Sequence, residues 1–333
     1  MRTFTLNLIV SVIIIAFNCC GTNNKENNGT DKDVTTQTVV EKHGKLSVDG
    51  IFMVDESGEK VALHGVSFGW HNWWPRFYNK GAVKTFANDW QCDVVRAAMG
   101  VEPERGYINE PEFSTQCVTR VVDAAIENGI YAIIDWHSHS IRTDEAVEFF
   151  RDMANRYKDY PNVIYEIFNE PVEDSWAEVK AYSEEVIKAI REIDKSNIII
   201  VGSPHWDQDI HIVADDPITG YDNIMYSLHF YAATHHQFLR DRGDYAISKG
   251  IPIFVSECAG MEATGDGPID YEEWQLWLDW MDNNHIGWAV WSIADKDETC
   301  SMMLPTAPAD GNWNDNHLKE WGKIVREELT KQQ

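Results

Sequence analysis

Two glutamates that each follow a short apolar run are the residues best placed to do chemistry. Glu170 lies two residues beyond Val163–Phe168, and Glu257 directly follows Ile253–Ser256. Two carboxyl groups can cleave a glycosidic bond if one protonates the leaving oxygen and the other attacks the anomeric carbon or activates water. We expect burial before Pro171 to raise the pKa of Glu170 and make it the acid. Glu257, beside His and Tyr donors, is expected to stay ionised. Acid/base and covalent catalysis by the two glutamates would require no metal or cofactor.

The elements that must position this pair are short apolar runs that alternate with amphipathic segments. The β-branched and apolar density of each run is typical of a strand buried on both faces. The runs are 63–68, 94–99, 131–135, 163–168, 198–201, 224–230, 253–256 and 287–293. Between them, Val118, Val121, Val122 and Ala125 repeat at helical spacing. Eight such units predict one α/β domain, a (β/α)8 TIM barrel, preceded by a small β-hairpin with its turn at Asp49-Gly50.

A doubly wound open sheet is the competing α/β layout. It would place a phosphate-binding glycine loop after an early strand, and Gly65-Val66-Ser67-Phe68-Gly69 lacks that pattern. In a barrel, functional residues gather at the C-terminal ends of the strands. Polar or aromatic residues occupy nearly every such position, which a purely structural barrel does not need. They are Arg96, Asp135-Trp136-His137, Asn169-Glu170, His229-Phe230-Tyr231, Glu257 and Trp291.

The strand-end motifs resemble glycoside hydrolase family 5, a family of retaining (β/α)8 enzymes with glutamates on strands four and seven. The run Tyr165-Glu166-Ile167-Phe168-Asn169-Glu170-Pro171 is similar to the family signature. The resemblance extends over about residues 45–330 and is strongest to the bacterial cellulase branch. Further matching runs are 61–67, 94–99, 133–137, 228–232, 235–240 and 291–292.

The resemblance implies roles for the residues around the two glutamates. Glu170 would be the acid/base and Glu257 the nucleophile of a double displacement. Asn169 would hold the sugar 2-hydroxyl, Arg96 would pair with the nucleophile, and Tyr231 would hydrogen-bond it.

It also implies contacts along the sugar chain. His229 would lie beside the acid/base, and His137 would contact the sugar before the cleavage point, with Trp291 as the floor under that sugar. Trp73 would serve the next sugar outward. More distant glucose units would meet Lys296 and Glu298.

Two segments depart from the family pattern. Cys258-Ala259-Gly260 follows the nucleophile, where Trp or Phe and Gly are common, and this could alter the subsites. The first loop, Phe68–Trp74, lacks the expected histidine, and His71, shifted by two positions, is assigned that role.

Two other classes of protein compete with a glycosidase. His137-Ser138-His139 forms an HxH pair of the kind that metal-dependent hydrolases use. It follows the third strand instead of the first, and His139 is interpreted as a loop residue. A non-catalytic glycan-binding barrel is the other alternative, and the presence of both Glu170 and Glu257 argues against it.

The expected substrate is a neutral β-1,4-glucan, cellulose or a soluble β-glucan, attacked as an endo-acting cellulase would. Mannan and xyloglucan remain alternatives, because a few hydrogen bonds and loop lengths discriminate among these polymers. The formal net charge of −26 disfavours nucleic acid and anionic lipid as partners. The 14 Trp residues suit stacking on sugar rings, and we expect a monomer.

The first 42 residues are expected to lie outside the catalytic domain. Residues 1–20 combine Arg2 with an apolar run and predict an export signal. The pair Cys19-Cys20 also resembles a lipoprotein processing site, so the protein is expected to be secreted, periplasmic or at the cell surface, with a lipid anchor at Cys19 or Cys20 as an open alternative. Residues 21–42 predict a flexible polar linker, and 43–333 the barrel. Pairing of the remaining cysteines, Cys92, Cys117, Cys258 and Cys300, is left open.

Overall fold

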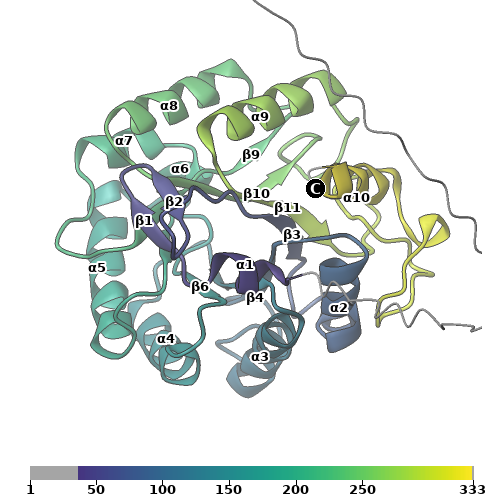
Figure 1. Cartoon of the computed structure of the whole chain (residues 1–333), viewed down its shortest axis with the longest axis horizontal. Coiled ribbons are helices and arrows are strands. Elements are labelled where there is room, and N and C mark those ends of the chain that lie inside the picture. The colour runs from purple at the N-terminus through teal and green to yellow at the C-terminus, as the bar shows by residue number, and fades with distance from the viewer. Residues whose placement is uncertain (1–36, 332–333) are drawn as a thin grey trace, which may run out of the picture. The chain divides into compact units, whose positions relative to one another are not determined.

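The computed structural model describes residues 37–331, and its main feature is a closed barrel of eight parallel strands (Figure 1). Each strand pairs with the next along the chain. The last strand also pairs with the first, and this closes the ring. The strands are β3 (His64–Phe68), β4 (Val94–Gly100), β5 (Tyr131–His137), β6 (Val163–Glu166), β7 (Ile199–Val201), β8 (Ile224–Ser227) with its continuation β9 (Phe230–Tyr231), β10 (Ile253–Ala259) and β11 (Trp288–Ile293). All eight predicted strands are therefore present.

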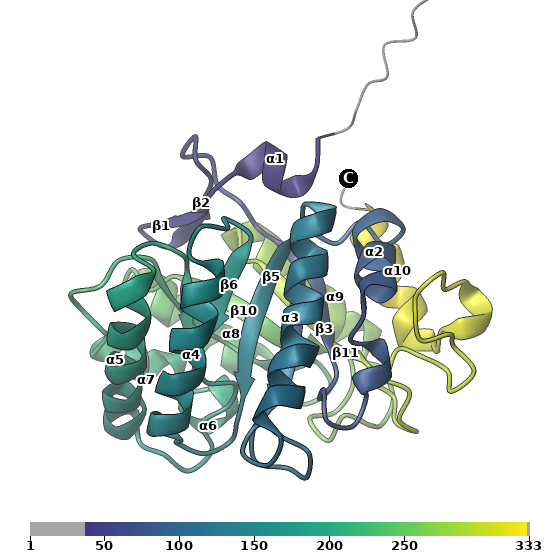
Figure 2. The same cartoon turned by 90° about the horizontal axis from the view of Figure 1, so that it is seen from below.

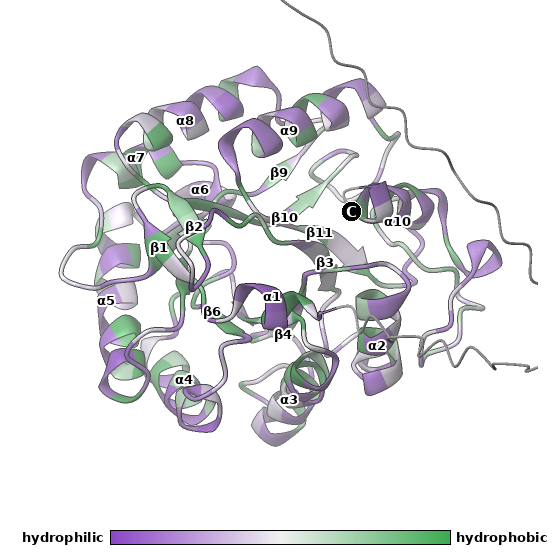
Figure 3. Cartoon of the chain, viewed as in Figure 1, coloured by the Kyte–Doolittle hydropathy of each residue, from purple (hydrophilic) through white to green (hydrophobic). Residues whose placement is uncertain are grey.

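Helices surround the barrel and turn their polar faces outward (Figure 3). Helix α3 illustrates the cause, because its predicted stripe of Val118, Val121, Val122 and Ala125 is fully buried. It begins with Pro111 in its first turn and ends at Gly129, whose left-handed φ of 67° favours glycine. The helices are α2 (Lys80–Asn88), α3 (Pro111–Asn128), α4 (Thr143–Tyr157), α5 (Trp176–Ile193), α6 (Pro204–Asp207), α7 (Ile210–Asp215), α8 (Gln237–Ser248), α9 (Tyr271–Asn284) and α10 (Glu320–Lys331), with 3₁₀ turns at Pro75–Phe77 and Asp315–His317.

The predicted hairpin is present as β1 (Ser47–Asp49) and β2 (Phe52–Val54). Together with helix α1 (Val39–His43) it lies at the end of the barrel from which the strands start, as the direction of β5 in Figure 2 shows. Side chains from this segment and from the strand starts form a second apolar cluster that fills this end. Its members are Leu46, Met53, Val61, Leu63, Val94, Tyr131, Ile133, Ile164, Ile198, Ile200, Met225 and Phe254. The opposite end is left for the functional site.

Helix α1 corrects the predicted end of the polar linker. The linker was expected to continue to residue 42, but Val39–His43 is helical because Thr38 and Glu41 form a capping box. The N–H of Val40 also donates to the carbonyl of Gly129 at 2.9 Å, which ties the helix to the barrel. The predicted export signal and the rest of the linker lie outside the described residues. Within 37–331, none of the helices has the length and apolarity needed to cross a membrane.

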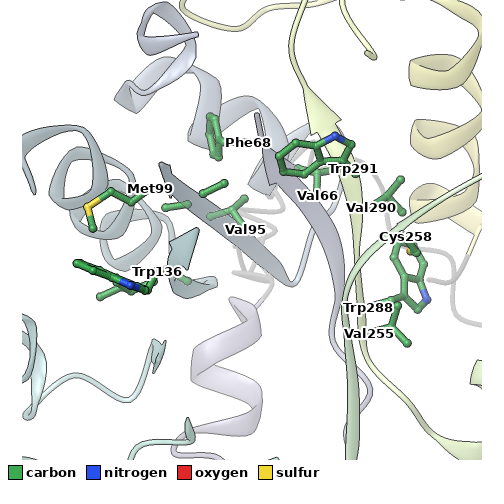
Figure 4. Close-up of a cluster of buried hydrophobic side chains, with 14 of the residues drawn as sticks. Val66, Phe68, Val95, Met99, Trp136, Val255, Cys258, Trp288, Val290 and Trp291 are labelled. Carbon is green, nitrogen blue, oxygen red and sulfur yellow. The ribbon is translucent and has the colours of Figure 1, made fainter. Parts of the chain in front are cut away.

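Close packing between strands fixes their positions, and Gly65 shows how. A Cβ atom at this position of β3 would lie 1.7 Å from the Val94 carbonyl oxygen of β4, so only glycine allows this approach. Side chains then alternate between the barrel interior and the helix layer. Figure 4 shows Val290 and Trp291, neighbours in β11, on opposite sides of their strand. The same alternation determines which residues reach the site.

Candidate active site

Glu170 and Glu257 meet at the C-terminal end of the barrel, as predicted. One carboxylate oxygen of each, and one ring nitrogen of His229, all lie within 4.8 Å of one another. Glu257 belongs to β10, whereas Glu170 lies four residues beyond β6 and donates its N–H to the Ser138 carbonyl at 3.2 Å. A carboxyl separation of roughly 5 Å is characteristic of retaining glycosidases.

A bulge in β10 aims two consecutive side chains at the site. Val255 pairs with Trp288 and Cys258 with Val290, so β10 has one residue more than β11 across this interval. An extra residue of this kind re-aims neighbouring side chains. Ser256 consequently reaches His229 while the adjacent Glu257 reaches Arg96. Cys258 faces the outer layer in Figure 4.

Both oxygens of Glu257 accept hydrogen bonds from donors that the resemblance implied. Arg96 Nη1 donates to Oε2 at 3.0 Å, and the Tyr231 hydroxyl donates to Oε1 at 2.8 Å. Burial raises the pKa of Tyr231 well above its ordinary value, and the charge of Glu257 raises it further. The hydroxyl therefore remains a donor at any working pH, and the carboxylate is held in one orientation.

Arg96 is a fully buried cation that lies among several buried carboxylates. It binds Glu166 through two bonds of 2.7 and 3.1 Å and approaches Asp135 Oδ2 to 2.9 Å. Burial raises the pKa of Glu166, and burial raises that of Asp135 to about 7, although in both cases the charge of Arg96 acts in the opposite direction. Burial by itself would lower the pKa of Arg96, but the three carboxylates raise it, so the guanidinium stays charged. Glu166 and Asp135 stood in the predicted motifs without a role.

Arg96 also orients Asn169, whose amide is partly unused. Arg96 Nη2 donates to the Asn169 side-chain oxygen at 2.7 Å. The Asn169 Nδ2 group is buried and makes no hydrogen bond within the described residues. A buried amide donor without a partner is costly, so a hydroxyl of a bound ligand would relieve that cost.

His137 and Trp291 form a stacked pair beside the two glutamates. Their rings are 5.2 Å apart with an interplanar angle of 1°. His137 Nδ1 lies 2.6 Å from Asp135 Oδ2, which fixes the ring orientation. Burial and the charge of Arg96 hold the pKa of His137 well below its ordinary value, so the imidazole is neutral. Trp291 is only 7% exposed, so a small part of its side chain reaches the surface.

Glu170 differs from Glu257 in its donors, which are both imidazoles. His229 Nδ1 lies 3.0 Å from Oε1, and His139 Nε2 lies 3.2 Å from Oε2. Burial raises the pKa of Glu170, but the hydrogen bonds from His139 and His229 lower it more, and the result is below the ordinary value. The expectation of a raised pKa is therefore wrong for the free protein, because the sequence did not reveal two histidines bonding one carboxylate. His139, interpreted as a loop residue, is one of them.

A buried polar cluster supports His229 from behind. Its Nε2 lies 2.9 Å from Ser256 Oγ and 3.2 Å from Asp207 Oδ2. Burial alone would lower the pKa of His229, but Asp207 and Glu170 raise it to about 9. Asp207 was missed by the sequence analysis. Ser227 Oγ donates to it at 2.7 Å and keeps it turned towards His229.

The α6 segment also brings an unpredicted aromatic side chain, Trp206, to the site. His205, Trp206 and Asp207 all have left-handed φ angles of 56° to 60°, a strained arrangement for non-glycine residues. Trp206 is 40% exposed and lines a cavity of about 480 Å³ that reaches Glu170 and Glu257. Other lining residues are His139, His205, Gln208, His229, Tyr231, His235, Ala263 and Thr264. The position of Trp206 shortly after a barrel strand could have marked it as a site residue. The left-handed backbone turn that presents it could not be predicted from the sequence.

On the β3–α2 loop, Trp73 presents an open aromatic surface, with 53% of its area exposed. Its ring packs at 4.9 Å on Trp70, which in turn contacts His137 at 4.2 Å. The predicted residues Lys296 and Glu298 form an ion pair with each other. Neither contributes to the 480 Å³ cavity.

His71 does not take the cleft position assigned to it. Its side chain is fully buried, with Nδ1 accepting from the Gly100 N–H at 3.0 Å and Nε2 bonded to Ser114 Oγ at 2.8 Å. Burial lowers its pKa to about 3, so it is a neutral structural residue that joins β4 to α3.

Within residues 37–331, the cysteines and one cluster of possible metal ligands are the other groups that could do chemistry. Cys92, Cys117, Cys258 and Cys300 are buried free thiols. Glu170, His229 and Glu257 are the one described group with the spacing of metal ligands. However, Arg96 already neutralises Glu257, and a second cation beside it would be repelled. The guanidinium therefore disfavours a metal ion between these three residues.

The fold and this constellation define a (β/α)8 barrel with one glutamate just after its fourth strand and the other on its seventh. A family model described as Cellulase (glycosyl hydrolase family 5) matches residues 54–297. The chain belongs to glycosyl hydrolase family 5.

Similar proteins agree with this membership. A structure from Cytophaga hutchinsonii has a TM-score of 0.87 and 45% identity, covering 89% of this chain and 97% of that one. The catalytic domain of Thermobifida fusca endoglucanase Cel5A has a TM-score of 0.84 and 34% identity, covering 88% of this chain and 100% of that one. Endoglucanase A of Evansella cellulosilytica is 42% identical over 99% of this chain. This chain spans 66% of that protein's length.

Proposed function

We propose that this protein is an endo-β-1,4-glucanase that hydrolyses cellulose or soluble β-glucan with retention of anomeric configuration. The observation that carries the proposal is the pair of carboxylates, Glu170 and Glu257, with oxygens within 4.8 Å of each other. Relatives named endoglucanase support the substrate class. A variant of the Thermobifida fusca enzyme was solved with cellotetraose, which also supports it.

In the first step, Glu257 attacks the anomeric carbon while Glu170 protonates the departing glycosidic oxygen. The bond between carbon and leaving oxygen breaks, and a glycosyl ester forms on Glu257. Arg96 and Tyr231 hold the attacking carboxylate in place through bonds of 3.0 and 2.8 Å. The unused Nδ2 of Asn169 would donate to the sugar 2-hydroxyl, a bond that strengthens in the transition state.

In the second step, Glu170 acts as a base. It removes a proton from water, the water oxygen attacks the anomeric carbon, and the ester bond to Glu257 breaks. A lowered pKa suits Glu170 for this step, because the carboxylate form is the base. Water enters from the side of the 480 Å³ cavity, where the leaving chain had been bound.

The aromatic surfaces divide between the two sides of the cleavage point. Trp206 lines the cavity next to Glu170 and would stack on the leaving half of the chain. His137 and Trp291 would contact the sugar that becomes attached to Glu257, and Trp73 would contact a sugar further out. Lys296 and Glu298 would contact more distant units. Contacts with sugars on both sides of the cleavage point would suit cleavage within a chain.

A substrate panel and product stereochemistry test the proposal. Reducing-sugar release should be highest on carboxymethyl cellulose or barley β-glucan, compared with xyloglucan and mannan. Proton NMR of freshly cleaved cellotetraose should show the β-anomer first. Glu257→Gln should abolish turnover, whereas Glu185→Gln on the exposed face of α5 should not. Initial α-anomer would refute double displacement, and mannan as the best substrate would refute the glucanase assignment.

We also propose that the protein acts outside the cytoplasm as a monomer, and that residues 1–20 direct its export. If this segment is processed as a lipoprotein signal, a lipid at Cys19 or Cys20 anchors the protein. The support is the sequence pattern alone. Mass spectrometry of the mature N-terminus tests this. A mature chain that begins at Met1 would refute export.

A further inference from the structure

The two imidazoles that bond Glu170 differ in how firmly they are held. The His229 side chain is 2% exposed and is fixed from behind by Asp207 and Ser256. The His139 side chain is 41% exposed and lines the cavity. Within residues 37–331, the bond to Glu170 is the one side-chain hydrogen bond that His139 makes. One donor is therefore rigid and the other is free to leave.

The surroundings of His139 hold its backbone more than its ring. The preceding Ser138 donates to Glu102 and accepts the N–H of Glu170 through its carbonyl. The ring itself rests against Trp70 at 5.6 Å and His137 at 6.2 Å, without a hydrogen bond to either. Rotation of the ring would therefore break only one polar contact.

His139 also bonds the oxygen that the reaction needs. His229 takes Oε1 of Glu170, so Oε2 is the oxygen left to protonate a leaving group in the cavity. A protonated Oε2 directs its hydrogen to the glycosidic oxygen and becomes a poor acceptor for an imidazole N–H. A sugar chain in the cavity and a bonded His139 thus compete for the same atom.

We propose that His139 is a displaceable positioning residue, which holds Glu170 as a carboxylate in the free protein and leaves Oε2 when a glucan chain enters the cleft. The inference rests on the proposed role of Glu170 as acid/base. On displacement, Oε2 takes up a proton from solvent and can donate it. After the leaving chain departs, His139 returns and favours the carboxylate that acts as base in the second step.

The charges around Glu170 give the direction of this effect. Its two hydrogen bonds, from His139 and His229, lower its pKa, so loss of one of them raises it. The pKa of His139 is itself raised: burial lowers it, but the bond and charge of Glu170 outweigh this, with Glu257 and Glu102 acting in the same sense. Other titratable groups that act on Glu170 or line its cavity are Asp135, Asp207, Tyr231, His205 and His235.

The kinetic test compares wild type with His139→Ala and His139→Gln on cellotetraose across pH. The alkaline limb of kcat/KM reports the acid in the free enzyme, and that of kcat reports the acid in the complex. Activity requires protonated Glu170, so a raised pKa moves the alkaline limb to higher pH. In His139→Ala we expect the kcat/KM limb to rise by about one pH unit, the size typical of losing one such bond. The kcat limb should stay in place, because His139 has already left.

His139→Gln retains an N–H donor without the positive charge and should give a smaller shift. His236→Ala, an exposed histidine at the start of α8, is the matched control and should move neither limb. Equal shifts of both limbs would mean that His139 stays bonded in the complex. Unmoved limbs would mean that it does not act on Glu170. Either result overturns the proposal.

A direct titration separates this inference from the proposed function. Carbon-13 NMR of the Glu170 carboxyl group gives its pKa in wild type and in both variants, whether or not the protein turns over. We expect a higher pKa in His139→Ala, and an equal pKa would overturn the inference. If wild type hydrolyses none of the glucans, the proposed function fails, and the NMR result still decides the effect of His139.

Discussion

Asp135→Asn is a clean perturbation of the buried charge network. Both contacts of Asp135, to His137 Nδ1 at 2.6 Å and to Arg96 Nη2 at 2.9 Å, involve the same oxygen, Oδ2. The other oxygen, Oδ1, is buried and makes no hydrogen bond within the described residues. An asparagine can place its amide oxygen at Oδ2 and its NH₂ at Oδ1. The substitution therefore removes a charge and keeps both contacts.

The expected effect is a change in how stability depends on pH. Burial raises the pKa of Asp135 from 3.8 to about 7, although Arg96 opposes this. The folded state therefore binds this proton more tightly than the unfolded state, so its contribution is fully present below about pH 4 and is lost as the pH rises through about 7. At about 1.4 kcal/mol per pKa unit, the loss is about 4 kcal/mol. In Asp135→Asn this part of the pH dependence disappears.

Urea unfolding of wild type and Asp135→Asn at several values between pH 4.5 and about 7.5 measures the difference. The free energy of unfolding of wild type should fall relative to the variant as the pH rises. Asp159→Asn, on an exposed turn, is the control and should follow wild type. Parallel curves for wild type and Asp135→Asn would refute the argument that burial outweighs Arg96 at this carboxyl group.

Three further predictions concern the site. Glu170→Gln should lower kcat/KM on carboxymethyl cellulose by about 10²- to 10⁴-fold. It should change kcat/KM little with 2,4-dinitrophenyl β-cellobioside, whose leaving group needs no proton, and equal losses on both substrates would contradict an acid role. Trp206→Ala should raise KM for cellotetraose about two- to tenfold through lost stacking, and an unchanged KM would remove it from the subsites. His71→Ala should lower the free energy of unfolding by about 2–3 kcal/mol while kcat is retained, and a large fall in kcat would restore its predicted place in the cleft.

The fold was predictable because its signals are local and repeated. Each barrel strand is rich in apolar residues, as 131–134 shows, and helix α3 carries its apolar stripe at regular spacing and ends before Gly129. Strand order then follows from chain order in a barrel, so Glu170 and Glu257 could be placed on one rim. Arg96 and Tyr231 also lie at strand ends, and their contacts with Glu257 are those that the family resemblance implied.

The parts that were missed depend on backbone geometry and on contacts between distant segments. Alternation along β10 would place Ser256 and Glu257 on opposite faces, and only the bulge brings both to the site. Trp206 and Asp207 are presented by consecutive left-handed residues with no sequence signature. The lowered pKa of Glu170 requires His139 and His229 together, and these come from separate loops.

The donors around each glutamate explain why two identical side chains can do different work. Glu257 accepts from a guanidinium and a phenol, and neither releases its proton near neutral pH, because carboxylates hold the pKa of Arg96 high and burial holds that of Tyr231 high. These two donors bond both oxygens of the Glu257 carboxylate and hold it in one orientation, as an attacking group requires. Glu170 accepts from two imidazoles, and neighbouring carboxylates raise the pKa of both, that of His229 to about 9. His139 is half-exposed, so Glu170 can lose this donor and take up a proton at Oε2. The difference between the two glutamates follows from their neighbours, not from their own chemistry.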